Sequence, residues 1–382
     1  MANSGLDRLP FIAAAAGTGT AAIIVFAIMP VLVGAMAERF DLDDLQSGLI
    51  ATAYFSSYAL VALSSPLWIR RWSWRLTGLA GFAIMLSALA VAYRGDTYSQ
   101  VQLAITVVGV GAGMLYPISL TLASDMDNTE RVYAIKLSVE QLVPAGLLVL
   151  MSLGWLIGPG VQHMLLAALL VVLLCLLASL AMPATGRLTQ QLNDTGGSLW
   201  RGVLALAALA ISFAGFAGLW VFLERIGSEQ GFESGFTALW LAVGLITSGV
   251  GPLLAAGVAN RFGQLRPLVF SIIPALCVIG LLSGQPGEAA YATVLTLLPL
   301  CYYFAISYMM SLIAAVDSNG KMSGLMSFAL AVGAASGPAL YGAVKAMDGP
   351  VLTAMGALIA TGTVLMVLVA RQLSTQSEEA TV

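Results

Sequence analysis

Charged residues are scarce in this chain. Only 9% of its 382 residues are Asp, Glu, Lys or Arg, and 59% are hydrophobic, whereas a soluble globular domain carries about 25% charged residues. Water would solvate such a surface poorly, so the solvent around most of the chain must be lipid. The composition therefore excludes a soluble protein and predicts a membrane protein.

Residues that carry catalysis or bind metals are also few. The chain has one histidine, His163, and three cysteines, Cys175, Cys277 and Cys301, which lie far apart in apolar runs without metal-ligand or disulfide spacing. It has neither a Gly-x-Ser-x-Gly nor a Gly-Lys-Ser/Thr motif. These absences argue against metal hydrolysis, a serine triad and direct ATP coupling, so we expect no enzymatic activity and no cofactor.

Long apolar runs are what the chain has instead. A bilayer core about 30 Å thick needs about 20 apolar residues per helix, and twelve runs of about that length can be counted. They lie near 11–36, 46–68, 76–93, 99–123, 132–156, 161–182, 200–223, 234–258, 267–283, 289–314, 322–344 and 350–370. The residues before the first run are too few and too weakly basic for a cleaved signal, so this run is expected to remain as a helix.

The breaks between the runs are short, apart from one polar stretch at the midpoint of the chain. This stretch, residues 186–198, contains Asn193, Asp194 and a Gly-Gly pair, which is typical of a flexible linker. We therefore predict an all-α polytopic membrane protein with a six-helix bundle over residues 1–185, a cytoplasmic linker over 186–198, and a second six-helix bundle with a short tail over 199–382.

Basic residues predict the orientation, because they favour the cytoplasmic side of a membrane. With twelve spans, the side that holds both chain ends collects twelve of them and the other side four. The twelve are Arg8, Arg70, Arg71, Arg75, Arg131, Lys136, Arg187, Arg201, Arg261, Arg266, Lys321 and Arg371. Both termini are thus expected in the cytoplasm, and we expect a multi-pass protein of the bacterial inner membrane.

The two halves share landmarks in the same order. Glu-Arg ends the first and seventh runs, Ser-Gly opens the run after each, and an acidic residue followed four positions later by a basic one precedes runs five and eleven. The landmarks are Glu38-Arg39 and Glu224-Arg225, Ser47-Gly48 and Ser234-Gly235, and Asp127 with Arg131 and Asp317 with Lys321. They predict a parallel repeat of six helices, which is one of the symmetries of secondary transporters.

The loops after the second and eighth runs resemble the Gly-x-x-x-Asp-Arg-x-Gly-x-Arg loop of the major facilitator superfamily. Residues 260–266 read Asn-Arg-Phe-Gly-Gln-Leu-Arg, with Asn in place of the acid, and residues 66–75 have Ile69 and Trp72 in place of the acid and the glycine. The resemblance covers nearly the whole chain. It implies two pseudo-symmetric six-helix bundles and a secondary transporter that works by alternating access. It also implies gating or structural roles for charged loop residues, which are Arg70, Arg75, Asp127, Arg131, Arg261, Arg266, Asp317 and Lys321.

Two glycine-rich fragments allow two interpretations. Residues 154–159 (Gly-Trp-Leu-Ile-Gly-Pro) and 333–342 resemble part of the antiporter motif of this family, which would favour export. Small residues also allow close helix packing in membranes, and this second interpretation is at least as good.

An acid and a base inside the fifth run are the main candidates for transport. Ionisable groups at membrane depth are costly, so each is a functional hypothesis. Lys136 and Glu140 lie one turn apart on one helix face, with Gln141 and Pro144 directly after them. Lys136 would attract an anionic group while Glu140, near the bilayer midplane, exchanges a proton. The alternative is a structural pair in which Lys136 reaches back to the cytoplasmic surface.

Aromatic residues supply the other expected cavity surface, because Tyr and Trp combine an apolar face with a polar tip. Tyr116 is favoured, since Pro117 beside it frees a backbone carbonyl. The other candidates are Tyr54, Trp220, Trp240, Tyr302 and Tyr303. Glu224 is a candidate second protonation site, although both halves have the equivalent residue, which favours a structural role at the outer surface.

The favoured function is uptake of a small organic solute together with protons, and Lys136 favours an anionic one. Proton-driven efflux of hydrophobic compounds is the runner-up, and a passive channel is a further alternative. Copper transport is suggested by Met309, Met310, Met322 and Met326, although methionine also fills gaps in helix packing. We expect the lipid bilayer as surroundings, no nucleic-acid partner, and a monomer.

Overall fold

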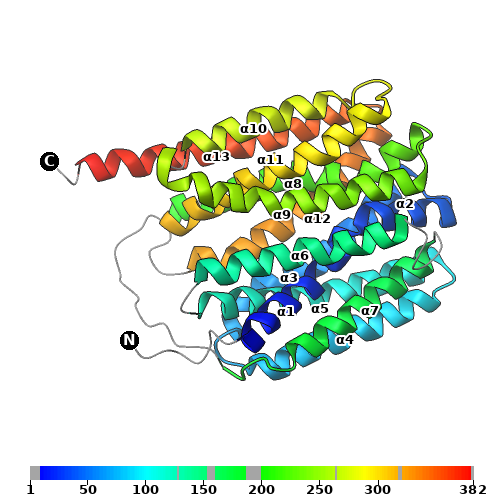
Figure 1. Ribbon diagram of the computed structural model, residues 1–382, viewed down its shortest axis with the longest axis horizontal. Helices are drawn as coiled ribbons and strands as arrows, with labels where there is room; N and C mark the ends of the chain where they lie inside the picture. The colour runs from blue at the N-terminus through cyan, green and yellow to red at the C-terminus, as the bar shows by residue number, and fades with distance from the viewer. Residues whose placement is uncertain are drawn as a thin grey trace.

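The structure, a computed structural model, describes residues 9–126, 129–152, 160–185, 199–262, 265–316 and 321–379. Thirteen α-helices make up most of this part of the chain (Figure 1). They are α1 (Leu9–Ala27), α2 (Met29–Phe40), α3 (Asp44–Trp68), α4 (Trp74–Arg94), α5 (Tyr98–Ser124), α6 (Thr129–Ser152), α7 (Val161–Ser179), α8 (Leu199–Glu229), α9 (Ser234–Phe262), α10 (Leu265–Gly280), α11 (Glu288–Val316), α12 (Lys321–Ala346) and α13 (Val351–Glu379). The linker predicted over 186–198 and the fragment at 154–159 lie outside the described residues.

The predicted helical, polytopic fold is confirmed. Ten of the helices are long and apolar enough to cross a membrane, and α10 is apolar but shorter. They lie roughly side by side along one direction, with the start of α1 and the end of α13 at one end of the molecule and α2 at the other (Figure 1). We call the end that holds α2 the distal end.

The first apolar run is not one helix, as predicted, but two. The run near 11–36 is divided at Ile28 into α1 and α2, and Pro30 lies in the first turn of α2. Proline has no amide hydrogen to donate four residues back, and its ring crowds the preceding turn. The carbonyl of Phe26 therefore loses its helical partner, and the indole Nε1 of Trp220 in α8 donates to it instead, at 3.4 Å.

Polar side chains explain where several helices begin. A carboxylate oxygen of Asp43 accepts from the Gln46 amide at 2.7 Å, and the Gln46 side chain accepts from the Asp43 amide at 3.1 Å. This capping box satisfies amides that the first turn of α3 leaves unpaired. Ser73 and Thr97 cap α4 and α5 in a simpler way. The box fixes Asp44, the first residue of α3, at the distal end.

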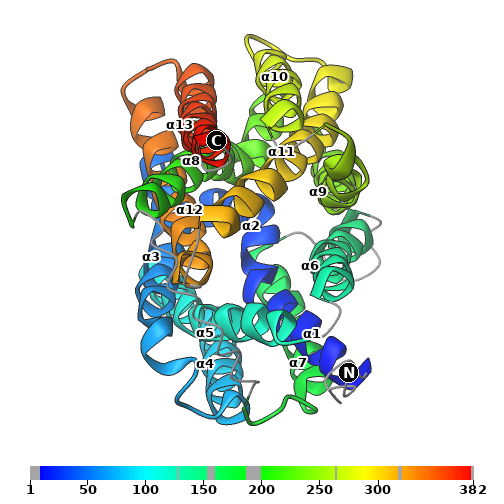
Figure 2. The ribbon, with the colours of Figure 1, turned by 90° about the vertical axis from the view of Figure 1, so that its left-hand side faces the viewer.

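We refer to helices α1–α7 as the N-half and to helices α8–α13 as the C-half. In the N-half α1 packs against α5, α6 and α7, and in the C-half α8 packs against α11, α12 and α13. Viewed along the helices, the N-half lies below and the C-half above, with α12 reaching down beside α3 (Figure 2). The halves meet mainly where α3 contacts α12, α6 contacts α9, and α2 contacts α8.

Glycines let α12 pack backbone to backbone against its neighbours. A Cβ atom added to Gly337 would lie 2.1 Å from the carbonyl oxygen of Ala214 in α8, and one added to Gly333 would lie 2.5 Å from another α8 carbonyl. A Cβ on Gly342 would lie 2.6 Å from a carbonyl of α3. The glycines of the 333–342 fragment thus bring helices close together, which supports the packing interpretation of that fragment.

Candidate functional site

A small cavity lies between the two halves, near the middle of the helices. Its volume is about 10 Å³, close to the least space that one water molecule needs. Most of its wall is apolar. Its lining residues are Ile23, Phe26, Ala27, Gln141, Phe216, Trp220, Leu245, Ser248, Pro299 and Tyr303. Both halves therefore contribute to it, and Gln141 and Ser248 are its polar points together with the hydroxyl of Tyr303.

Lys136 and Glu140 form a buried ion pair in α6, next to Gln141. Lys136 is 0% exposed and Glu140 is 1% exposed, and the Lys136 ammonium contacts a Glu140 carboxylate oxygen directly. Lys136 therefore does not extend to the surface, contrary to the snorkelling alternative. Because each charge would be costly to bury alone, each requires the other.

The N-half surrounds this pair closely. The Lys136 ammonium lies over the ring of Tyr116, 4.5 Å from its centroid, which stabilises a cation in an apolar setting. The Glu140 carboxylate lies against Gly19 of α1, where an added Cβ would be 1.8 Å from it. The Ser119 hydroxyl oxygen would also lie close to this added Cβ, at 2.7 Å. Glycine at position 19 thus makes the space that the carboxylate occupies.

Gln141 links the ion pair to the C-half. The Ser248 hydroxyl of α9 donates to the Gln141 side-chain oxygen at 3.0 Å, and Gln141 also hydrogen-bonds with the Tyr303 side chain of α11. Glu140, next to Gln141 in sequence, interacts electrostatically with Tyr303 as well. The pair, the amide and the tyrosine form a continuous polar group from the N-half into the C-half.

The aromatic candidates fall into two sets. Trp220 and Tyr303 line the cavity, and Tyr116 contacts Lys136. Tyr54 and Tyr302 are instead 0% exposed within their own halves. The Tyr54 hydroxyl donates to the Ala22 carbonyl, and that of Tyr302 donates to Ser212.

The remaining two candidates lie nearer the distal end. Trp240 in α9 is half-buried against Phe236 and is not among the lining residues. Glu224 in α8 is half-buried, with its carboxylate against Gly34 of α2, where an added Cβ would lie 1.8 Å from it. An acid of the C-half thus contacts the backbone of the N-half.

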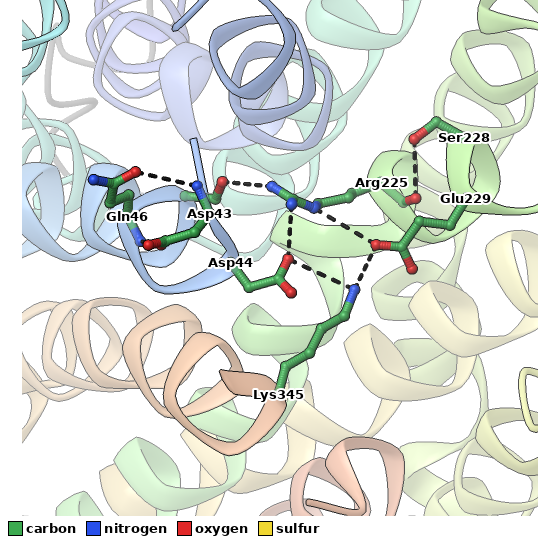
Figure 3. Close-up of polar contacts among 8 residues, drawn as sticks. Asp43, Asp44, Gln46, Arg225, Ser228, Glu229 and Lys345 are labelled. Atoms are coloured by element: carbon green, nitrogen blue, oxygen red, sulfur yellow. Dashed lines mark hydrogen bonds and ion pairs between the residues drawn. The ribbon is translucent and has the colours of Figure 1, made fainter. Parts of the chain in front are cut away.

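Four charged residues, which we call the distal cluster, join the halves at the distal end (Figure 3). They are Asp44, Arg225, Glu229 and Lys345. Asp44 of the N-half lies 2.9 Å from the Arg225 guanidinium and 3.6 Å from the Lys345 ammonium. Lys345 also lies 2.5 Å from Glu229. Asp44 is therefore the one member from the N-half, and its two ion pairs connect α3 with α8 and α12.

At the opposite end, Arg70 forms an ion pair with an acid that the sequence did not suggest. Its guanidinium nitrogens lie 2.6 and 2.8 Å from the two carboxylate oxygens of Asp125, at the end of α5. The position before Arg70 holds Ile69 instead of the acid of the family loop, and Asp125 supplies the negative charge from another helix. Arg75 donates from Nε to the Met182 carbonyl at 2.9 Å, so both arginines hold N-half segments together.

The other predicted gating residues are placed only in part. Arg266 is exposed at the start of α10. Asp127 and Asp317 lie outside the described residues, as do the side chains of Arg131, Arg261 and Lys321. Of the methionines, Met309 is 0% exposed in the hydrophobic core, which is the ordinary packing role.

Comparison with known proteins agrees with this architecture. Residues 14–338 match the family described as Major Facilitator Superfamily. The chain belongs to this family. Among solved structures it is similar to that described as a Major Facilitator Superfamily transporter, FucP, in the outward conformation, with 15% sequence identity and a TM-score of 0.65. That match covers 94% of this chain and 98% of FucP, which shows a shared fold. No curated protein sequence matches the chain.

Membership of the Major Facilitator Superfamily fixes the general role. The chain is a multi-pass membrane protein and a secondary transporter, and a transporter of this kind implies a small-molecule substrate. The cavity lined by side chains of both the N-half and the C-half is consistent with this role.

Proposed function

We propose that this protein carries a small organic, anionic solute across the membrane by alternating access, coupled to protons. The observation that carries the proposal is the buried Lys136–Glu140 pair, whose acid precedes Gln141 in sequence and interacts with Tyr303, both of which line the cavity between the halves. A buried charge pair is weak evidence for stability, so retaining one next to a cavity favours a role in binding.

The chemistry assigns different tasks to the two residues. An incoming carboxylate or phosphate on the solute would compete with Glu140 for the Lys136 ammonium. Glu140 would then hold a negative charge without its partner in a place shielded from water, which favours taking up a proton. Solute and proton would thereby enter the site together, while Gln141 and Tyr303 provide neutral hydrogen bonds.

The arrangement in the membrane is part of the proposal. We infer twelve spans in two pseudo-symmetric copies of six, with α1 and α2 together as the first span. Both termini would lie in the cytoplasm of a bacterial inner membrane, as the basic residues indicate, and the protein would act as a monomer. The distal cluster then lies on the outer side, so its ion pairs close the outer path in this conformation.

A direct test begins with a thermal-shift screen of purified protein against metabolites and drugs, because a ligand that binds the native state raises its stability. We expect an organic anion to stabilise the protein and to show saturable counterflow in proteoliposomes. Glu140→Gln should abolish uphill uptake driven by a pH gradient, whereas Glu288→Gln, at an exposed acid of α11, should not. Wild-type pH dependence in Glu140→Gln would contradict the proposal, and non-saturating flux would indicate a channel.

Efflux of hydrophobic compounds is the second candidate, and the apolar wall of the cavity favours it. Phe216, Trp220, Phe26, Ile23 and Leu245 would suit a ring-containing solute without charge. The screen separates the two functions, because stabilisation by neutral aromatic compounds in preference to anions would support efflux.

Opening of the outer path is tested at the distal cluster. Asp44→Asn removes both ion pairs that the cluster makes between the halves. At these partly exposed positions the two pairs together contribute about 1 kcal/mol after screening by solvent. We therefore expect a shift of about fivefold towards a conformation open at the distal end.

The measurement uses Ala27→Cys, at the cavity wall, in a chain whose three native cysteines are replaced by alanine. Labelling of the introduced thiol by an impermeant maleimide added from outside should become about fivefold faster with Asp44→Asn. Asp41→Asn is the matched control, because Asp41 lies in the loop just before α3 and is exposed. Equal labelling rates in the two variants would show that the cluster does not hold the outer path closed.

A further inference from the structure

A second, larger cavity opens on the side of the C-half, between α9, α10 and α11. Its volume is about 560 Å³, which is in the range of sites for small molecules. We call it the lateral groove. Its lining residues are Leu254, Arg266, Pro267, Phe270, Ser271, Leu300, Cys301 and Phe304. It shares no residue with the cavity between the halves.

The walls of the lateral groove face the surrounding lipid. Phe270 is 71% exposed and Leu254 is 49% exposed, with Val269 and Ile273 exposed on the same helix as Phe270. In a membrane protein, apolar side chains that are exposed on the membrane-spanning part of a helix contact acyl chains. The groove is therefore open to the bilayer.

One charge lies in this apolar groove. Arg266, in the first turn of α10, is exposed, and in the described part of the chain it has no ion pair. The Ser271 hydroxyl donates to the Leu268 carbonyl at 2.9 Å, so it is not free to donate to a ligand. The positive end of the α10 dipole adds to the charge of Arg266. Among the described residues that line the groove, the one charge is thus positive.

We propose that the lateral groove binds one anionic phospholipid, with its phosphate on Arg266 and an acyl chain along Phe270, Leu300 and Phe304. Basic pockets between membrane helices on the cytoplasmic side bind anionic headgroups, and Arg matches phosphate with two parallel hydrogen bonds. The α10 start lies at the same end of the molecule as the end of α13. Charge and apolar wall together favour a lipid over a soluble anion, which would leave the wall uncovered.

The test compares short-chain phosphatidylglycerol with phosphatidylcholine on purified full-length protein in neutral detergent. Native mass spectrometry measures the lipid retained, and the thermal unfolding midpoint measures stabilisation. We expect wild type to bind phosphatidylglycerol more tightly than phosphatidylcholine. Arg266→Gln should weaken phosphatidylglycerol binding about fivefold, which is the contribution of one basic residue near an anionic surface, whereas Arg266→Lys, which keeps the charge but not the two parallel hydrogen bonds, should weaken it less.

Arg71→Gln is the matched control, because Arg71 is another exposed arginine at the same end of the molecule and does not line the groove. It should bind phosphatidylglycerol like wild type. An equal loss of phosphatidylglycerol binding in Arg71→Gln and Arg266→Gln would overturn the proposal, because it would show that binding depends only on the net charge of the protein. Equal binding of the two lipids by wild type would also overturn it, and so would equal stabilisation by glycerol phosphate without acyl chains.

Discussion

Replacing Lys136 alone by methionine is expected to destabilise the protein by about 3–5 kcal/mol, the usual effect of removing one member of a buried ion pair. The variant leaves the Glu140 carboxyl group without its partner, 1% exposed and against the backbone of Gly19, so it must either stay charged at a high cost or take up a proton. It also removes the contact between the Lys136 ammonium and the Tyr116 ring. Thermal unfolding in detergent, followed by intrinsic fluorescence or by binding of a thiol-reactive dye, measures the change.

Replacing both members should reverse most of that loss. A Lys136→Met and Glu140→Leu double variant has no buried charge, and apolar replacements of similar volume are often neutral or stabilising. We therefore expect unfolding near the wild-type temperature. Transport should nevertheless be lost, because the site can then neither attract an anion nor exchange a proton.

Lys345→Met is the control for removing an ammonium, since Lys345 belongs to the partly exposed distal cluster and should cost at most about 1 kcal/mol. A Lys136→Met variant as stable as Lys345→Met would contradict the buried pair. Wild-type transport by the double variant would show that the pair serves structure alone.

Gly337→Ala is expected to destabilise the protein by about 1–3 kcal/mol, although the same change at Gly146 should stabilise it by about 0.5–1 kcal/mol. Alanine is the better helix former by that amount where space allows. Apart from its chain neighbours and the nearby backbone of its own helix, no described atom lies within 4 Å of a Cβ added at Gly146, whereas one at Gly337 would be 2.1 Å from the Ala214 carbonyl oxygen. That backbone contact can be relieved only by moving α12 away from α8, which is the cost of overpacking.

The opposite signs make this pair of variants informative. Both positions lie inside long helices, so helix propensity alone predicts the same sign for both. Thermal unfolding of the two single variants beside wild type measures the difference. Equal stabilisation by the two alanines would mean that α8 and α12 do not approach as closely as described.

The helices were predictable because lipid imposes a simple rule. A segment of about 20 apolar residues in this solvent must satisfy its backbone internally, which makes it a helix. The break at Ile28 was harder to foresee, although Pro30 is visible in the sequence. Several helices here, α5 and α6 among them, contain a proline without being divided, so its presence alone does not decide between a bend and a break.

The candidate site could be predicted only where a residue is unusual in itself. Lys136 and Glu140 stand out because charges are rare in apolar runs, and the structure pairs them in a buried position next to Gln141, which lines the cavity. Ser248 does not stand out, because serine is common in membrane helices and its link to Gln141 depends on how α6 meets α9. Tyr54 and Tyr303 look alike in sequence, and only the packing shows that Tyr303 lines the cavity.

Charge pairs between distant helices were missed for a related reason. Each member lies at a helix end, where charged residues are ordinary, so the sequence offers no sign that Asp44 and Lys345 meet. Arg70 was predicted as a gating or structural residue, but no partner was predicted for it. Asp125 fills that role from α5, which loop spacing alone does not reveal.

The break in the first span has one more consequence, which concerns the bond between Phe26 and Trp220. A carbonyl oxygen that an uninterrupted helix would keep for itself is shared with the opposite half only because proline stands four residues later. Because Pro30 has no amide hydrogen, no change in the shape of the first span can give this oxygen a helical partner. A motion that parts the halves here therefore leaves the Phe26 carbonyl unpaired, unless water or a solute donates a hydrogen bond to it.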